Sequence, residues 1–365
     1  MKKLLILHPY LAPYRLDLYN RLCEDYDVLV FIYGGKKEKA SLGFDLTFLR
    51  QNAHFRFIEQ ETGLYVGRHL VSCVYISILK DFKPDYVLSH ELGVNTLVMN
   101  WLKKLFGFKH LITVDDSLAM AQNYGKKREI LRSYVYRRVD GICVVNKKVE
   151  SYLISVYEDL KLRTFVLPII QNDELLSAKI QSARTLAEQY STDYALKGKK
   201  VILFVARMIP IKRPMLLFEE FAKAGYKDCV LVFVGGGEEL TALKKKMSET
   251  ATSNVIITGP LYGKDLYAWY YIADLFVLPS EKEAFGAVVN EALVAGCKVL
   301  ISDAAGASEL VNDANGLVFN SRSTEDFAKK LSLSVAGIEN KKEHQSIMPF
   351  TFDALYGSFT KFLES

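Results

Sequence analysis

The sequence contains no apolar run long enough to cross a lipid bilayer. Its longest apolar stretches, residues 70–79 and 201–206, fall well short of the roughly 18 to 20 residues that a membrane-spanning helix needs. A transmembrane helix is therefore not expected. The chain has 365 residues, of which 50% are hydrophobic, and this length is about twice that of a common ~150-residue domain. These values favour two globular domains and exclude a disordered chain.

Cysteine and histidine are too scattered to form a disulfide framework or a metal-ligand cluster. The sequence has five cysteines and six histidines, but no H-E-x-x-H motif and no Cys/His group at metal-ligand spacing. We interpret the cysteines as reduced packing residues of a cytoplasmic protein. We expect no bound metal and no cofactor.

Positive charge is concentrated in the first half of the chain. Residues 1–174 carry 25 Lys and Arg against 20 Asp and Glu, so the net charge of +5 arises there. Within residues 101–138, nine basic residues accompany three acidic ones and alternate with Trp101, Phe106 and Phe108. This pattern is typical either of contact with an anionic membrane surface or of a solvated face over core aromatics. No nucleic-acid-binding motif accompanies it, so nucleic acid is not an expected partner.

Short apolar runs alternate with helical patterns along the whole chain, which predicts βα units, parallel sheets and an α/β fold class. Helices are expected over residues 14–25, 67–82, 93–106, 128–139 and 147–157 of the first half. The expected strands are residues 3–8, 27–33, 54–57, 86–89, 110–114, 141–145 and 164–167 in the first half, and 201–205, 229–235, 254–258, 275–278, 298–302 and 317–319 in the second.

The domain organisation follows from the interval between the two series of strands. We expect one Rossmann-like domain over residues 1–172, a linker region over 173–198 and a second such domain over 199–351. A helix over about residues 352–365 could pack back onto the first domain. Two doubly wound domains of this kind can place the carboxyl ends of their strands around a central cleft, where such sheets bind ligands.

The segment 279–293 has the clearest local pattern in the chain. It runs from the end of a strand through Gly286 into a helix, with two carboxylates eight positions apart at Glu283 and Glu291. Free backbone N–H groups near residues 286–288 could bind an anion such as a diphosphate. The alternative is an ordinary helix start, in which the negative charge of Glu283 interacts favourably with the helix dipole and Glu291 is solvated.

A second cluster of charge follows the first strand of the second half. Arg207 and Lys212 flank a loop that is stiffened by Pro210. These two cations would suit a phosphate, Arg as a planar fork and Lys as a point charge. The alternative is a solvated basic loop.

Two glycine-containing turns complete this set. Gly235, Gly236 and Gly237 end one strand, and Gly259, Pro260 and Leu261 end another. The triple glycine lacks the spacing of a dinucleotide or Walker motif, so each turn alone is weak. All four segments nevertheless lie at predicted carboxyl ends of strands in the second half. We interpret them together as a site for a nucleoside diphosphate.

These residues resemble the GT-B-fold retaining glycosyltransferases known as glycosyl transferases group 1, or family 4. The segment from Glu283 to Glu291 matches the E-x7-E signature of that family, and Arg207 and Lys212 match its paired basic positions. The resemblance is strong over residues 199–320 and weaker in the first half.

The resemblance implies a role for each matching residue. Glu291 would bind the donor ribose, Glu283 would bind hydroxyls of the transferred sugar, and Arg207 with Lys212 would neutralise the diphosphate. Gly306 and Glu309 resemble turns near the donor, with roles that stay open. The other implied donor-binding residues are Gly236, Gly259, Pro260, Leu261, Phe285, Gly286, Ala287 and Val288.

The implied activity is metal-independent transfer of a sugar from a nucleoside-diphosphate sugar, with retention at the anomeric carbon. A UDP-sugar is favoured, with a GDP-sugar next. The expected acceptor is a glycan or a lipid-linked oligosaccharide of cell-surface polysaccharide synthesis. The protein is expected to be cytoplasmic and peripheral on the inner face of the plasma membrane. The alternatives are a sugar-nucleotide epimerase of the same fold and a catalytically silent scaffold that binds a sugar nucleotide.

The first half departs from the family pattern at two points. The loop at residues 8–15 replaces the glycine pair that many relatives carry after the first strand. Asp115 and Asp116 stand where relatives often have a histidine. Each of them could lie near the reacting carbon, and the alternative is that it caps the next helix. The candidate acceptor-side residues are Tyr14, Arg15, His90 and Glu91, the last two being equally consistent with a packed or solvated pair.

Overall fold

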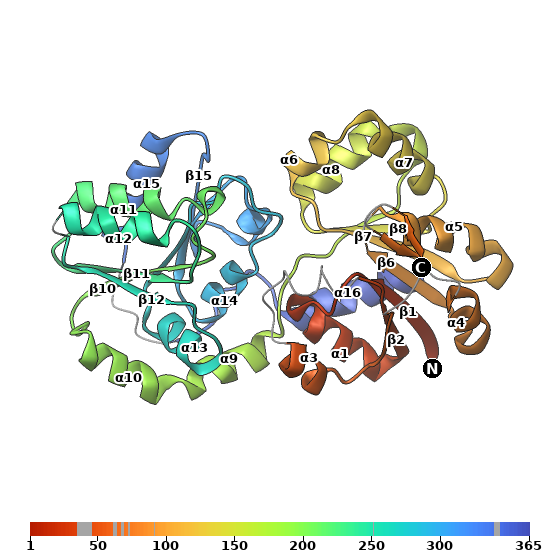
Figure 1. Ribbon diagram of the computed structural model, residues 1–365, viewed down its shortest axis with the longest axis horizontal. Helices are drawn as coiled ribbons and strands as arrows, with labels where there is room; N and C mark the ends of the chain where they lie inside the picture. The colour runs from red at the N-terminus through yellow and green to blue at the C-terminus, as the bar shows by residue number, and fades with distance from the viewer. Residues whose placement is uncertain are drawn as a thin grey trace. The chain divides into compact units, whose positions relative to one another are not determined.

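The computed structural model describes residues 1–34, 46–60, 64–66, 69–71, 74–90, 92–250, 252–338 and 344–365. The chain divides into two compact units. Unit 1 consists of Met1–Gln171 and Asp353–Ser365, and unit 2 consists of Asn172–Phe352. Each unit is built around one parallel sheet with helices on its faces (Figure 1). The predicted doubly wound α/β class is therefore confirmed.

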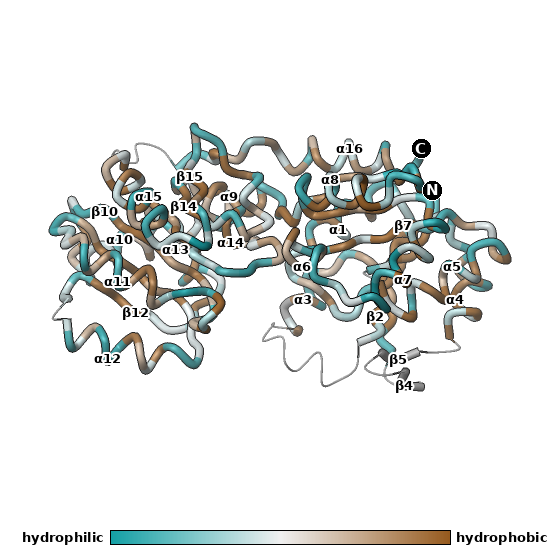
Figure 2. The backbone as a smooth tube through the Cα atoms, turned by 90° about the horizontal axis from the view of Figure 1, so that it is seen from above, coloured by the Kyte–Doolittle hydropathy of each residue, from teal (hydrophilic) through white to brown (hydrophobic). Residues whose placement is uncertain are grey.

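Unit 1 contains a seven-stranded sheet in the order β3-β2-β1-β6-β7-β8-β9, and all neighbouring strands are parallel. Its central strands are buried on both faces and therefore read as nearly continuous apolar runs, which are brown over most of their length in Figure 2. The strands are β1 (Lys2–His8), β2 (Tyr26–Ile32), β3 (Arg56–Glu59), β6 (Tyr86–His90), β7 (Lys109–Val114), β8 (Gly141–Val144) and β9 (Thr164–Val166).

The helices of unit 1 bury their apolar stripes against this sheet. Buried residues of α4 and α5 pack with those of β1, β2 and β6, whereas those of α7 and α8 pack with β7 and β8. The helices are η1 (Pro13–Arg15), α1 (Leu16–Asp25), α3 (Leu46–Asn52), α4 (Val74–Phe82), α5 (Val94–Phe106), α6 (Leu118–Gln122), α7 (Lys126–Tyr136), α8 (Lys147–Val156) and η2 (Glu158–Leu160).

One predicted helix of unit 1 is wrong over its first part. The sequence favoured a helix over residues 67–82, but the helix α4 begins only at Val74. The strands β4 (Leu64–Val66) and β5 (His69–Val71) form an antiparallel pair before it. The apolar residues from 70 onward fit helical spacing, yet the first two of them, Leu70 and Val71, pair with another strand. A local pattern does not record that pairing.

Unit 2 contains a six-stranded parallel sheet in the order β12-β11-β10-β13-β14-β15. The helices α11, α12 and α15 share one core on one face of this sheet. The strands are β10 (Lys200–Val205), β11 (Cys229–Val234), β12 (Val255–Gly259), β13 (Leu275–Leu278), β14 (Lys298–Ser302) and β15 (Gly316–Phe319). The helices are η3 (Pro210–Lys212), α11 (Pro214–Ala224), α12 (Leu240–Thr250), α13 (Gly263–Ile272), α14 (Val288–Val294), η4 (Gly306–Leu310) and α15 (Thr324–Ala336).

Two segments at the borders of the units have a definite place in the fold. Residues 173–198, expected as a linker region, form α9 (Asp173–Ser182) and α10 (Arg184–Asp193). Both helices pack on α13, α10 through a small apolar cluster, so they are part of unit 2 (Figure 1).

The helix α16 (Phe352–Glu364) lies in unit 1, beside strands that are far from it in sequence (Figure 1). The ring of Phe362 in this helix stacks on that of Phe165 of β9, with ring centroids 5.2 Å apart. The hydroxyl of Tyr356 donates to Asp25, and Phe359 and Leu363 are completely buried. The last helix therefore completes the core of the unit in which the chain begins.

Candidate functional site

The two sheets have the same kind of strand order. In each, the chain adds strands first on one side of the first strand and then on the other, so the order of strands reverses beside that first strand. In unit 1 the first strand lies between β2 and β6, and in unit 2 the first strand, β10, lies between β11 and β13. In open parallel sheets, ligands bind at the carboxyl ends of the strands beside such a reversal. Both units carry their candidate residues there.

In unit 2 three loops lie against one another at this edge. The backbone N–H of Met208 donates to Gly236 O (2.8 Å), and the N–H of Gly235 donates to Gly259 O (2.9 Å). Gly235 and Gly237 have φ values of +138° and +153°, and a Cβ on either would collide with the backbone of residues 206–208. These positions need glycine, and the three loops hold each other in place.

The charged residues of the second half meet across two of these loops. Lys212, at the end of η3, forms an ion pair with Glu283, which lies in the loop after β13. Both side chains are about 15% exposed. The N–H of Glu281 donates to Ile211 O (2.8 Å), which ties the two loops together. Arg207 is exposed on the loop that carries Lys212.

The segment after Glu283 approaches the helix α14 as predicted. Val289 and Asn290 donate their N–H groups back to Gly286 and Ala287, so the N–H groups of residues 286–288 precede the first bonded turn. Phe285 is buried, which makes it a packing residue of this loop.

The second glutamate of the motif, Glu291, faces a neighbouring helix. It lies beside Tyr270 of α13, and burial together with the Glu291 carboxylate raises the pKa of that tyrosine. The solvated alternative for Glu291 is therefore wrong. Gly306 is buried and Glu309 half-buried in η4, after β14.

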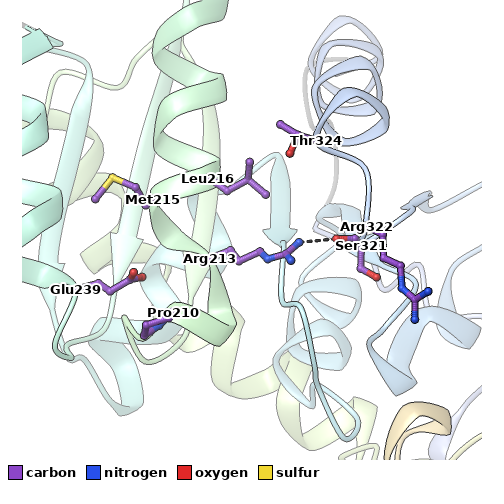
Figure 3. A pocket seen from close by; sticks show the side chains of 8 residues that line it. All are labelled: Pro210, Arg213, Met215, Leu216, Glu239, Ser321, Arg322 and Thr324. Carbon is purple, nitrogen blue, oxygen red and sulfur yellow. Dashed lines mark hydrogen bonds between the residues drawn. The ribbon is translucent and has the colours of Figure 1, made fainter.

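A cavity of about 280 Å³ opens beside this region of unit 2 (Figure 3). Arg213 crosses it and donates to Ser321 O (2.5 Å). None of the predicted site residues lines the cavity, so it is distinct from the predicted donor site. The lining residues are Pro210, Arg213, Met215, Leu216, Glu239, Ser321, Arg322 and Thr324.

In unit 1 a buried polar cluster occupies the corresponding edge of the sheet. His8 ends β1, His90 ends β6, and Thr113 lies opposite His90 on β7. The rings of His8 and His90 lie 4.2 Å apart, and His90 Nδ1 is 3.0 Å from Thr113 Oγ1. Burial lowers the pKa of His90 to about 3, and it lowers that of His8 well below its ordinary value. Both imidazoles are therefore neutral near pH 7.

Asp115 joins this cluster through an ion pair with Arg15, which lies a hundred positions earlier in the chain. Arg15 Nη2 is 2.7 Å from Asp115 Oδ1, and both side chains are at least 90% buried. The other oxygen, Asp115 Oδ2, lies 4.0 Å from His90 Nδ1. Among the described residues, Asp115 Oδ2 and His8 Nε2 are buried and have no hydrogen-bond partner.

The neighbouring Asp116 belongs to a different network. It accepts a hydrogen bond from Tyr124 and lies 3.4 Å from the fully buried guanidinium of Arg132. Burial raises the pKa of Asp116, although Tyr124 and Arg132 lower it. The N-cap of α6 is Ser117, whose hydroxyl accepts from Met120 N. The interpretation of either aspartate as the cap of that helix is therefore wrong.

The remaining predicted acceptor-side residues lie around this cluster or outside the described residues. Tyr14 is half-buried in η1, and its hydroxyl is 3.0 Å from that of Tyr10. Glu91 lies outside the residues that the structure describes. The sequence analysis missed His8 and Thr113. Their one signal is that each lies at the carboxyl end of a predicted strand.

Two larger features are absent from the described ranges, a membrane-spanning helix and a metal-ligand cluster. No helix there is both long and apolar enough to cross a membrane. No group of three or more His, Cys, Asp or Glu side chains is placed to hold a metal ion in that part of the chain.

Comparison with known sequences gives a partial match. Residues 188–345 match the family described as "Glycosyl transferases group 1". The O-antigen biosynthesis glycosyltransferase WbnH of Escherichia coli is 28% identical over 254 residues, which cover 66% of this chain and 72% of that protein. A GDP-mannose-dependent alpha-mannosyltransferase of Corynebacterium glutamicum is 31% identical over 151 residues, 41% of this chain but only 34% of that enzyme.

Comparison with solved structures covers the whole chain. The Anabaena protein HepE in complex with UDP and glucose has a TM-score of 0.72 at 16% identity, with 100% of both chains covered. A glycosyltransferase from Rickettsia africae has a TM-score of 0.75 at 15% identity, with 100% of this chain and 98% of that chain covered. These similarities show that the two Rossmann-like units form a GT-B fold.

Proposed function

We propose that the chain is a member of the glycosyl transferases group 1 family, which its residues 188–345 match, and that it transfers a sugar from a nucleoside-diphosphate sugar to a hydroxyl group. One observation carries this proposal. Lys212 and Glu283, from loops 71 positions apart, meet at the sheet edge where doubly wound folds bind ligands, and both lie within the family match.

Unit 2 is the proposed donor unit. Arg207 and Lys212 bind the diphosphate and stabilise the negative charge that develops on it as the sugar leaves. In the free protein Glu283 neutralises Lys212 and fixes its ammonium group. When the donor binds, the ammonium contacts a phosphate oxygen and the Glu283 carboxylate accepts hydrogen bonds from hydroxyls of the transferred sugar. This charge stabilisation needs no metal, and we propose a metal-independent reaction.

The rest of the donor is assigned to the segments around this pair. Glu291 binds the ribose, and Gly259, Pro260 and Leu261 border the base. Gly236, the backbone of Phe285 and residues 286–288 line the diphosphate and sugar. UDP is the favoured nucleotide, because HepE is described in complex with UDP. GDP is next, because the Corynebacterium enzyme is described as GDP-mannose-dependent.

Unit 1 is the proposed acceptor unit. Asp115 Oδ2 and His8 Nε2 are buried and lack hydrogen-bond partners among the described residues. His8 Nδ1 lies 2.6 Å from the carbonyl oxygen of Tyr10, so in the neutral ring Nδ1 carries the proton and donates it, and Nε2 can only accept. Hydroxyl groups of a sugar would satisfy both atoms, whereas a phosphate or carboxylate would not. Tyr14, Arg15 and His90 surround these atoms. Asp115, and not Asp116, is therefore the proposed residue near the reacting carbon.

The proposed acceptor is a glycan or a lipid-linked oligosaccharide of cell-surface polysaccharide synthesis. The likeness to WbnH, which is described as an O-antigen biosynthesis glycosyltransferase, supports this class. Retention at the anomeric carbon, with the leaving phosphate taking the acceptor proton, is part of the same proposal. The proposed location is the cytoplasmic face of the plasma membrane.

A panel of nucleotide sugars tests the function directly. The purified protein is mixed with each UDP- and GDP-sugar in the presence of EDTA, and thermal stabilisation and release of nucleoside diphosphate are followed. Stabilisation by one donor class, with release that rises when a glycan acceptor is added, is the expected result. Epimerised donor would show an epimerase, binding without release would show a scaffold, and no binding would overturn the donor site.

A further inference from the structure

The helices α5 and α7 of unit 1 lie side by side and expose large apolar side chains. Leu105 is 77% exposed, Ile130 is 72% exposed and Trp101 is 63% exposed, which places them among the most exposed large hydrophobic residues of the described chain. Trp101 Nε1 donates to the hydroxyl of Tyr134 across the two helices (2.9 Å). Figure 2 shows hydrophobic and hydrophilic residues mixed along α5.

Helical spacing places basic residues on the same faces as these apolar ones. Lys104 lies between Trp101 and Leu105 on α5, and residues three or four positions apart share a helix face. On α7 the same spacing joins Lys127, Ile130, Tyr134 and, just past the helix end, Arg138, whose guanidinium stacks on Tyr134 at 3.7 Å. We call this the α5–α7 surface; it consists of Trp101, Lys104, Leu105, Lys127, Ile130, Tyr134 and Arg138.

The charge of this surface is positive because the acidic residues of the segment are either buried or paired. Asp115 and Asp116 are buried in their two networks. Glu129 is held by Arg132 (3.0 Å) and by the Tyr157 hydroxyl (2.5 Å). The exposed charges of the segment between residues 101 and 138 are therefore basic: Lys104, Lys109, Lys126, Lys127, Arg137 and Arg138.

We propose that the α5–α7 surface binds an anionic lipid bilayer. Trp101, Leu105 and Ile130 enter the interface between headgroups and acyl chains, and the surrounding lysines and arginines bind lipid phosphates. Tryptophan with its N–H bonded, flanked by aliphatic and basic side chains, fits that boundary. A nucleic acid would use the positive charge but leave the aliphatic side chains in water. The surface stands apart from sugar transfer, and only its link to a lipid-linked acceptor rests on the proposed function.

The chain contains its own probe for this contact. It has two tryptophans, and the second, Trp269, is 1% exposed in unit 2. On vesicles of phosphatidylcholine mixed with phosphatidylglycerol, we expect the fluorescence of Trp101 to shift to shorter wavelength and to be quenched by brominated lipid. Vesicles of phosphatidylcholine alone should give a much smaller change. The Trp101→Phe variant, which keeps Trp269, should give none.

Substitutions separate the contribution of charge from that of insertion. Each of Lys104→Gln and Lys127→Gln should weaken vesicle binding about fivefold, from about 1 kcal/mol for each basic residue near an anionic surface. Leu105→Ser with Ile130→Ser should weaken it at least about tenfold. The matched controls lie in unit 2: Lys244→Gln is equally basic and exposed, and Leu333→Ser replaces a leucine that is 54% exposed.

Three outcomes would overturn the proposal: no association with anionic vesicles, equal association with neutral ones, or full binding by the Leu105→Ser, Ile130→Ser variant. The last result would mean that the surface binds vesicles by charge alone. Single-stranded DNA added as a competitor should then displace the protein from the vesicles. Release of nucleoside diphosphate is measured in parallel without vesicles. Turnover without lipid binding refutes the surface alone, and lipid binding without turnover refutes the proposed function alone.

Discussion

The two units carry their candidate residues at the same place in the fold, but in opposite surroundings. Arg15, His90 and Asp115 of unit 1 are buried. Lys212 of unit 2 is partly accessible and Arg207 is exposed. A buried charge depends on its partner for the stability of the fold, whereas an accessible charge is solvated and can exchange its partner for a ligand. One topology can therefore hold either a buried polar cluster or a partly accessible ion pair at the same edge of its sheet.

The largest expected effect separates the two ion pairs by stability. Arg15→Ala leaves the Asp115 carboxylate buried without its cation, and the free energy of unfolding should fall by about 3 to 5 kcal/mol. Chemical denaturation measures the change in the free energy of unfolding, and hydrogen exchange of β1 and β6 shows whether the loss lies in unit 1. Lys212→Ala should cost clearly less, because water reaches its partner Glu283.

A double variant checks that the cause is the unpaired charge. Arg15→Met with Asp115→Leu removes both charges, and much of the lost stability should return. Equal destabilisation by the single and double variants would show that packing, and not charge, holds this part of unit 1.

The next effect separates the pairs by activity. Lys212→Ala should remove about 2 to 4 kcal/mol of transition-state stabilisation, seen as a fall in kcat/KM at unchanged folding, because it removes one donor to the developing charge. Lys282→Ala is the matched control, because Lys282 is an exposed lysine that directly precedes Glu283 in the same loop. Equal kcat/KM in both variants would exclude Lys212 from the reaction.

Acid should weaken unit 1 before unit 2. The pKa values of His90 and His110 are lowered to about 3 by burial, so between about pH 6.5 and pH 3 the unfolded chain binds more protons than the folded one. Stability is therefore full above about pH 6.5 and falls as the pH drops, by up to about 1.4 kcal/mol per pH unit for each histidine. His8 acts in the same direction.

Hydrogen exchange measured at several pH values tests this order. Protection of β1, β6 and β7 should decrease with falling pH sooner than that of β10 and β13. A parallel decrease in both units would mean that the buried histidines do not determine the acid sensitivity.

The smallest effect separates acceptor from donor. His8→Gln should reduce kcat/KM for the acceptor about fivefold, the size of one hydrogen bond of about 1 kcal/mol, with donor affinity unchanged. Glu291→Ala should do the opposite, weakening donor binding at a constant acceptor KM. Steady-state kinetics with each substrate varied in turn distinguish the two patterns, and a reversed result would exchange the assigned roles of the units.

The sequence predicted most of the fold because strands buried on both faces are plain apolar runs. It also predicted that Lys212 and Glu283 belong to one site, since each follows a strand in a recognisable motif. It could not distinguish Asp115 from Asp116. That distinction depends on Arg15 and Arg132, which lie elsewhere in the chain and reach the two carboxylates only after folding.

The path of the chain also makes the two units differ in what completes their cores. Unit 2 is one continuous segment, Asn172–Phe352, whereas unit 1 needs Asp353–Ser365 to complete its core. Phe359 and Leu363 are fully buried there. Unit 2 can therefore form its whole core from its own continuous segment, whereas unit 1 keeps an open apolar surface until α16 packs on it. Folding of unit 1 is thus coupled to a segment far from the rest of that unit in sequence, whereas folding of unit 2 is not.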